Sequence, residues 1–137
     1  MTDEIRRVDY YYASITDRPG EGLKLLSALE KAGVSLRLFY GFPTGDRRTQ
    51  VDLVADDAAK LGSTLKDAGF ALTGPRKAFV ITGSDRVGAL AEHARKLAGA
   101  GINIRAIAAI EAGAGRFGMI LWVAQADFER AAGALGA

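Results

Sequence analysis

Two short turns of matching sequence contain the residues best suited to bind a ligand. Asp17-Arg18-Pro19-Gly20 and Asp85-Arg86-Val87-Gly88 lie 68 positions apart (85 − 17), and each precedes a segment with helical spacing of apolar residues. A helix start leaves several backbone N–H groups without partners and carries a partial positive charge, which suits a carboxylate. The glycine that ends each turn lets a ligand approach the backbone closely, and Pro19 has no N–H to lose there. At least one of the two turns is therefore expected to bind an anionic group of a small molecule.

An α-amino acid also needs acceptors for its ammonium group, and two polar residues are placed to supply them. Ser35 and Asn103 occupy equivalent positions just past the two predicted helix ends, and each offers a side-chain oxygen. The structural alternative, for each copy separately, is that Asp17 or Asp85 only caps its own helix. The predicted ligand-binding residues are Asp17, Arg18, Pro19, Gly20, Ser35, Asp85, Arg86, Val87, Gly88 and Asn103.

Other kinds of site are disfavoured by the residue types that the chain lacks. It has no cysteine and a single histidine, His93, so thiolate chemistry and a zinc or iron site are not expected. His93 lies beside Glu92 on the side of a helix that periodicity assigns as polar, and we expect it to be solvated. Only a carboxylate pair, Asp17 with Asp85, leaves a catalytic arrangement open. We expect no enzyme activity, no catalytic residue, no metal and no cofactor.

The two turns are part of a repeat that runs along the chain. Ala32-Gly33-Val34-Ser35-Leu36-Arg37 returns as Ala100-Gly101-Ile102-Asn103-Ile104-Arg105 at the same offset. In each copy the apolar period changes in the order strand, helix, two strands, helix, strand. This predicts an α+β protein of two ferredoxin-like βαββαβ units, residues 1–74 and 75–137, each an antiparallel sheet with both helices on one face. The second unit is expected to lack its last strand, because a counterpart of Ala71 would fall after Ala137.

Helical spacing also predicts which side of each helix is buried. In the first helix of the first copy the apolar stripe comprises Leu25, Leu26, Leu29 and Ala32. In the first helix of the second copy it comprises Val87, Leu90, Ala91, Ala94 and Ala98. The second helix of the first copy has Ala58, Leu61, Leu65 and Ala68 on one side.

The Asp-Arg-Pro-Gly turn, followed by a leucine-rich helix and Ala32-Gly33-Val34-Ser35-Leu36, resembles the pattern of the ACT domain. The second copy has Val87 in place of proline but the more typical Gly101-Ile102-Asn103-Ile104. This resemblance covers nearly the whole chain and implies a regulatory module that binds amino acids at interfaces between paired domains. No enzyme accompanies the two units in this sequence, so the chain resembles the stand-alone tandem members. We therefore expect a non-enzymatic sensor of an amino acid or similar small metabolite, with an enzyme or regulator as its target.

Apolar side chains are also expected on the sheet face that the helices leave open. A sheet face in contact with water should be mostly polar, and large apolar patches mark interfaces. We therefore predict a homodimer through this face. Because aromatic side chains on a βαββαβ sheet can stack on bases, an RNA-binding module is the alternative function, although the RNP-type motif is missing. The predicted face comprises Tyr10, Tyr12, Phe39, Val54, Val80, Ile107, Ile120 and Trp122.

Composition is that of a soluble globular protein. Hydrophobic residues make up 49% and charged residues 25%, and the formal net charge is +2 with the basic residues scattered in pairs. Nucleic-acid binders concentrate basic charge on one surface, so this distribution disfavours a nucleic-acid partner. No segment has the roughly 18 apolar residues of a membrane span, and no apolar leader is present. We expect a cytoplasmic location and no membrane partner.

Overall fold

The structure is a computed structural model and describes residues 2–137. Each half of the chain contains three strands and two helices in the same order. The first half contains β1 (Glu4–Thr16), α1 (Glu21–Ala32), β2 (Leu36–Gly45), β3 (Arg48–Ala55) and α2 (Ala58–Asp67). The second half contains β4 (Leu72–Ser84), α3 (Ala89–Gly99), β5 (Ile104–Gly113), β6 (Arg116–Val123), the 3₁₀ turn η1 (Gln125–Asp127) and α4 (Phe128–Leu135).

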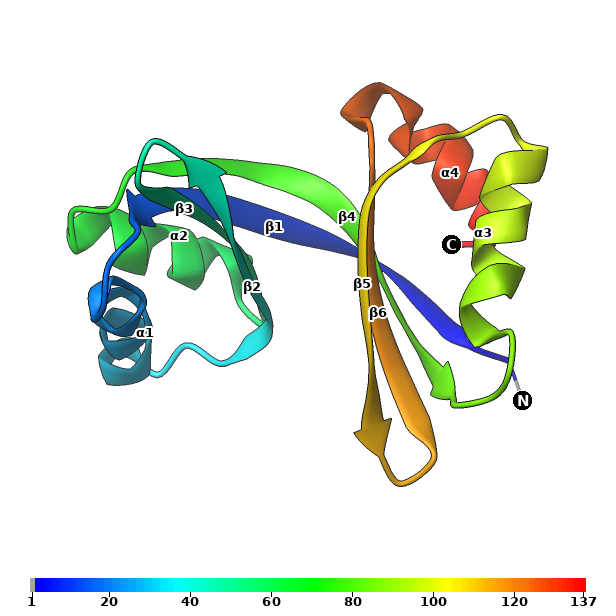
Figure 1. Cartoon of the computed structure of the whole chain (residues 1–137), viewed down its shortest axis with the longest axis horizontal. Helices are drawn as coiled ribbons and strands as arrows, with labels where there is room; N and C mark the ends of the chain where they lie inside the picture. The colour runs from blue at the N-terminus through cyan, green and yellow to red at the C-terminus, as the bar shows by residue number, and fades with distance from the viewer. Residues whose placement is uncertain (1) are drawn as a thin grey trace. The chain divides into compact units, whose positions relative to one another are not determined.

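The chain folds into two compact units. The first unit is Asp9–Arg76, and the second consists of Lys77–Ala137 together with the residues up to Val8. Within the first unit the strands lie in the order β2-β3-β1-β4, and within the second in the order β1-β4-β6-β5. The paired strands β1/β3, β2/β3, β4/β6 and β5/β6 are all antiparallel. Figure 1 shows α1 and α2 on one side of the first unit's strands, and α3 and α4 on one side of β5 and β6. The predicted α+β, ferredoxin-like fold class is confirmed.

Strand register repeats between the units as the sequence repeat predicts. Tyr11 pairs with Leu53 in the first unit, and Phe79 pairs with Leu121 in the second, so both partners move by the same 68 positions (79 − 11 and 121 − 53). Equal register places equivalent residues on equivalent faces, because side chains alternate along a strand. A residue of one unit can therefore be compared directly with its counterpart in the other.

The two units share their long strands, and this changes the prediction of a missing last strand. β1 begins at Glu4, and its N-terminal part, up to Val8, belongs to the second unit, next to β4 (Figure 1). The edge that the second copy cannot cover with its own sequence is thus covered by residues from the start of the chain. In the same way Leu72–Arg76, the first part of β4, closes the first unit. The charged residues Glu4 and Arg6 concealed this strand from pattern reading.

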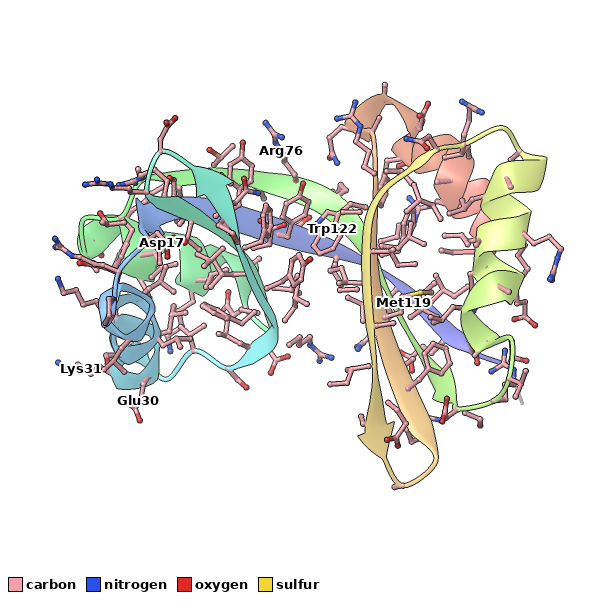
Figure 2. The ribbon with its side chains drawn as sticks, viewed as in Figure 1. Asp17, Glu30, Lys31, Arg76, Met119 and Trp122 are labelled. Carbon is pink, nitrogen blue, oxygen red and sulfur yellow. The ribbon has the colours of Figure 1, made fainter. Side chains whose placement is uncertain are left out.

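Each unit has its own apolar core between its sheet and its helices. In the first unit Leu25 and Leu29 of α1 and Leu61 and Leu65 of α2 are fully buried. In the second unit the core includes Leu97 of α3 and the stacked rings of Phe79 and Phe128, whose centroids lie 4.4 Å apart. Met119 points from β6 to the helix side (Figure 2). Stacked aromatic pairs of this kind add to the free energy gained by burying each ring.

The predicted buried side of α3 is wrong. The helix buries Ala89, His93 and Leu97, whereas Val87 is fully exposed and Leu90 is 38% exposed. At the repeat offset of 68, His93 and Leu97 correspond to Leu25 and Leu29, which are the buried residues of α1. Because the α3 segment is rich in alanine, small residues on both sides obscured the buried side in the sequence.

The predicted open sheet face is also partly wrong. Tyr10, Val54, Ile120 and Trp122 are already buried in a single chain, with Trp122 only 5% exposed. Phe39 and Ile107 are 39% and 43% exposed and thus fit the prediction. Four of the eight residues therefore need no partner molecule to shield them from water.

Candidate functional site

Both predicted turns are bounded by a glycine in a conformation that other residues avoid. Gly20 and Gly88 are the N-cap residues of α1 and α3, with φ of 88° and 84°. Neither helix start receives a hydrogen bond from a capping side chain within residues 2–137. The alternative in which Asp17 or Asp85 caps its helix is therefore wrong. At the start of α3, Ala89 N–H donates to the Arg86 carbonyl at 3.2 Å, and the first helical bond runs from Glu92 N–H to the Gly88 carbonyl. Between them, the N–H groups of Leu90 and Ala91 precede the helical hydrogen-bond ladder and can serve another partner.

A hairpin of the same unit fixes the backbone of each turn. Asp17 N–H donates to the Arg47 carbonyl at 2.8 Å, and Asp85 N–H donates to the Gly115 carbonyl at 2.8 Å. Figure 2 shows Asp17 where β1 passes into α1. The two turns therefore have the same backbone frame, and differences between them come from side chains.

The turn of the second unit borders a cleft of about 360 Å³. This volume falls within the range of small-molecule sites, about 300–1,000 Å³. Of the predicted residues, Asp85, Arg86 and Gly88 line the cleft, whereas Val87 and Asn103 do not. The remaining lining residues are Ala89, Leu90 and Ala91 at the start of α3, Ala109, Ile110 and Glu111 of β5, and Phe117 of β6. Sequence reasoning did not find the β5 wall, and Glu111 adds a carboxylate to it.

An ion-pair cluster with a buried carboxylate lies next to this cleft. The Arg86 guanidinium donates from Nη1 to Asp3 Oδ1 and from Nη2 to Asp3 Oδ2, both at 3.1 Å. His93 Nε2 lies 2.7 Å from Asp3 Oδ2. The Asp3 side chain is 2% exposed and His93 is 1% exposed. We call Asp3, Arg86 and His93 the Asp3 cluster. It joins the N-terminal part of the second unit to the turn that borders the cleft.

The carboxylate of Asp3 is held in its ionised form. Burial alone would raise the pKa of Asp3, but the hydrogen bonds from Arg86 and His93 and the attraction of the Arg86 charge outweigh burial, so the pKa of Asp3 is lowered. The backbone opposite Asp3 is also adapted to it, because a Cβ atom at Gly83 would overlap the Asp3 carboxylate. Glycine at position 83 thus leaves room for a buried carboxylate.

The expectation that His93 is solvated is wrong. Its ring lies in the core of the second unit, where Nδ1 has no hydrogen-bond partner among residues 2–137. A proton on Nε2 can be donated to the Asp3 carboxylate, whereas a proton on Nδ1 would be a buried donor without an acceptor. We therefore assign the Nε2–H tautomer. The repeat offset could have identified this position, because 93 − 68 gives Leu25, a core residue of α1.

The equivalent turn of the first unit has simpler contacts. Arg18 Nε donates to Glu21 at 2.7 Å, and Lys24 also pairs with Glu21, all on the surface. Asp17, Arg18, Pro19 and Gly20 are exposed. Ser35 is exposed as well, and its carbonyl accepts the Asp56 N–H at 3.2 Å. The first turn is therefore a surface turn without a buried cluster beside it.

Three groups near the cleft have the types that bind metal ions. Ligand atoms of Asp3, Glu92 and His93 lie within 4.8 Å of one another. However, Arg86 already donates to both carboxylates, reaching Glu92 Oε2 at 3.3 Å, and so supplies the positive charge that an ion would bring. The 2.7 Å separation of His93 and Asp3 is also that of a hydrogen bond. These residues fit an ion-pair cluster and do not fit a metal site.

Comparison with known proteins shows the fold. No family model and no curated protein matches the sequence. The Bacteroides thetaiotaomicron protein BT0572 superposes with a TM-score of 0.84 at 16% identity, over 96% of this chain and 88% of that protein. The regulatory subunit of aspartate kinase from Thermus thermophilus superposes with a TM-score of 0.67 at 19% identity, over 99% of this chain and 95% of that subunit. The same subunit from Thermus flavus gives 0.63 at 20% identity, with coverage of 99% and 95%. The chain therefore has the tandem ACT-type fold of these regulatory subunits, as its repeat and turn motif predict.

Proposed function

We propose that this protein is a non-enzymatic regulator that binds an amino acid or a similar small metabolite in the cleft of the second unit. The observation that carries the proposal is the cleft itself, which forms at one of the two turns predicted to bind a ligand. The fold supports a regulatory role, because the solved structures that share it include subunits described as regulatory. Fold alone does not assign a ligand, so the groups in the cleft must do so.

The groups that line the cleft complement a zwitterion. The N–H groups of Leu90 and Ala91, which precede the first helical bond of α3, suit a carboxylate. Asp85 and Glu111 supply carboxylate oxygens for an ammonium group, and Ile110, Leu90 and Phe117 give the cleft apolar surface for a side chain. An amino acid presents these three features together. Ser35 and Asn103 lie outside this lining and remain predicted contacts only.

Two further expectations accompany this proposal. The first is a target protein, an enzyme or another regulator, whose activity changes when the metabolite binds. The second is a homodimer through the part of the predicted face that stays exposed, Phe39 and Ile107. This interface would be larger if the second copy of the chain also covered Tyr12. RNA binding is not favoured, because two of its proposed stacking residues, Tyr10 and Trp122, are buried. No helix within residues 2–137 has the length and apolar character to cross a membrane.

A thermal-shift screen with each of the twenty amino acids tests the proposed function. A molecule that binds only the folded state raises the free energy of unfolding, by about 2.7 kcal/mol at a concentration 100 times its dissociation constant, and so raises the apparent melting temperature. At least one amino acid is expected to raise the melting temperature in a concentration-dependent way. If none does at millimolar concentration, an amino acid is not the ligand.

A further inference from the structure

The two turns share one backbone frame but differ in how their arginines are held, and this difference bears on which of them binds. We propose that ligand binding is confined to the second unit, where Asp3 and His93 act as positioning residues that fix Arg86 and the Asp85–Gly88 turn, whereas the first turn is structural. The inference rests on the proposed function and specifies which of two sequence-equivalent turns carries it.

Comparison of equivalent positions supports this asymmetry. His93 replaces Leu25 and Gly83 replaces Ile15 at the repeat offset of 68 (93 − 25 and 83 − 15). Leu25 and Ile15 are buried core residues of the first unit. The fold itself is therefore stable with apolar residues at both positions. Burying a histidine at position 93 and the Asp3 carboxylate beside Gly83 costs free energy, because buried polar groups lose their hydration and Nδ1 of His93 has no partner within residues 2–137.

The buried polar groups converge on Arg86. Its two terminal nitrogens donate to four acceptors: both oxygens of Asp3, Glu92 Oε2, and the Ser84 carbonyl at 2.9 Å. Ser84 is the last residue of β4, so Arg86 also ties the turn to the end of that strand. Bidentate pairing with a buried carboxylate fixes both the position and the plane of a guanidinium.

Arg18, the counterpart of Arg86, is held much less firmly. Its guanidinium pairs with the Glu21 carboxylate at 2.7 Å, and its side chain is 64% exposed, compared with 36% for Arg86. A binding site gains affinity when its groups are fixed before the ligand arrives, because less conformational entropy is lost on binding. The cleft therefore lies beside the turn that is preorganised, and the stabilising groups come from outside the turn.

The single histidine of the chain makes a site-specific test possible. The amino acid that gives the largest thermal shift is titrated into tag-free protein while the imidazole signals of His93 are followed by NMR, and the heat of binding is measured in parallel. We expect the His93 signals to shift with the same dissociation constant as the heat, and a stoichiometry of one molecule per chain. Hydrogen–deuterium exchange should slow at 85–91 and 109–111, and stay unchanged at 17–23.

Matched substitutions separate a positioning role from a merely structural one. Arg86→Met and Asp3→Asn should each weaken binding by about tenfold or more, the effect of losing one charge-assisted hydrogen bond. Arg18→Met, the equivalent change in the first unit, should leave the dissociation constant within about twofold. Because Asp3→Asn also removes a buried charge, His93→Leu serves as the second variant. It restores the residue that the first unit has at this position, and it should weaken binding while the melting temperature changes little.

Several outcomes would overturn this inference and leave the proposed function intact. A stoichiometry of two, slowed exchange at 17–23, or an affinity that depends on Arg18 would assign binding to the first turn as well. Wild-type affinity in both Asp3→Asn and His93→Leu would make the Asp3 cluster purely structural. If no amino acid binds wild-type protein, the proposed function fails and this inference fails with it, and that result is distinct from binding at the other turn.

Discussion

Residues 3–8 should contribute to the stability of the second unit, although the whole of the first unit, Asp9–Arg76, separates them in sequence from the rest of it. Ile5 packs against the second core while partly buried, and Asp3 bonds to His93. Truncating a fully buried isoleucine to alanine costs about 2–5 kcal/mol, so a partly buried one should cost about 1–2 kcal/mol. Loss of a hydrogen bond to a charged group costs about 1.5–3 kcal/mol. The double variant Asp3→Asn/Ile5→Ala should therefore lose about 2.5–5 kcal/mol, a large share of the 5–15 kcal/mol typical of a domain.

Urea unfolding and hydrogen–deuterium exchange would measure this loss and locate it. We expect a lower urea midpoint and faster exchange in α3 and α4, with α1 and α2 close to wild type. Glu4→Ala is the matched control on the same strand, because the Glu4 side chain lies on the surface in an ion pair with Arg6 at 3.3 Å, and such pairs are worth about 0–1 kcal/mol. If the double variant unfolds at the same urea concentration as this control, the N-terminal strand does not complete the second unit.

Three further predictions concern other parts of the molecule. Burial raises the pKa of Asp52, and the hydrogen bond from Gln50 opposes this with a smaller effect. The protonated carboxyl therefore favours the folded state below the unfolded pKa of about 3.9, and this stability is lost as the pH rises through the folded pKa. Asp52→Asn should hence be more stable than wild type in urea at pH 7, and this advantage should vanish near pH 3. Gly20→Ala and Gly88→Ala should each cost about 1–2 kcal/mol of left-handed strain by the same unfolding assay, but calorimetry should show weaker amino-acid binding for Gly88→Ala alone. Ile107→Glu, on an exposed side chain, should shift a homodimer to monomer in sedimentation at tens of micromolar, and an unchanged sedimentation coefficient would place the dimer interface elsewhere.

The repeat made most of the fold predictable from sequence. A constant offset fixes the order of elements and the strand register together, because a slip of one residue would turn every core side chain to the other face. Tyr11 with Leu53 and Phe79 with Leu121 obey this rule. The start of β1 was not predictable in the same way. This part of β1 pairs with a strand that is far away in the sequence, so only an alternation of apolar and polar residues could have identified it. Glu4 and Arg6 interrupt the apolar character of the segment, and charged residues are common on such strands.

The candidate site was predictable only as far as local rules reach. A strand-to-helix turn with glycine at its end is a local feature, so both turns were found, but nothing local distinguishes Arg86 from Arg18. What distinguishes them is Asp3, which lies 83 residues before Arg86 and reaches it only through the shared strand. His93 was misassigned because helical periodicity treats histidine as polar and therefore solvated. Comparison with Leu25 would have placed it in the core, where a polar residue is expected to have a specific partner. In a duplicated sequence, polar residues at positions where the other copy is apolar therefore distinguish two copies that the shared motif leaves equivalent, as His93 does at the position of Leu25.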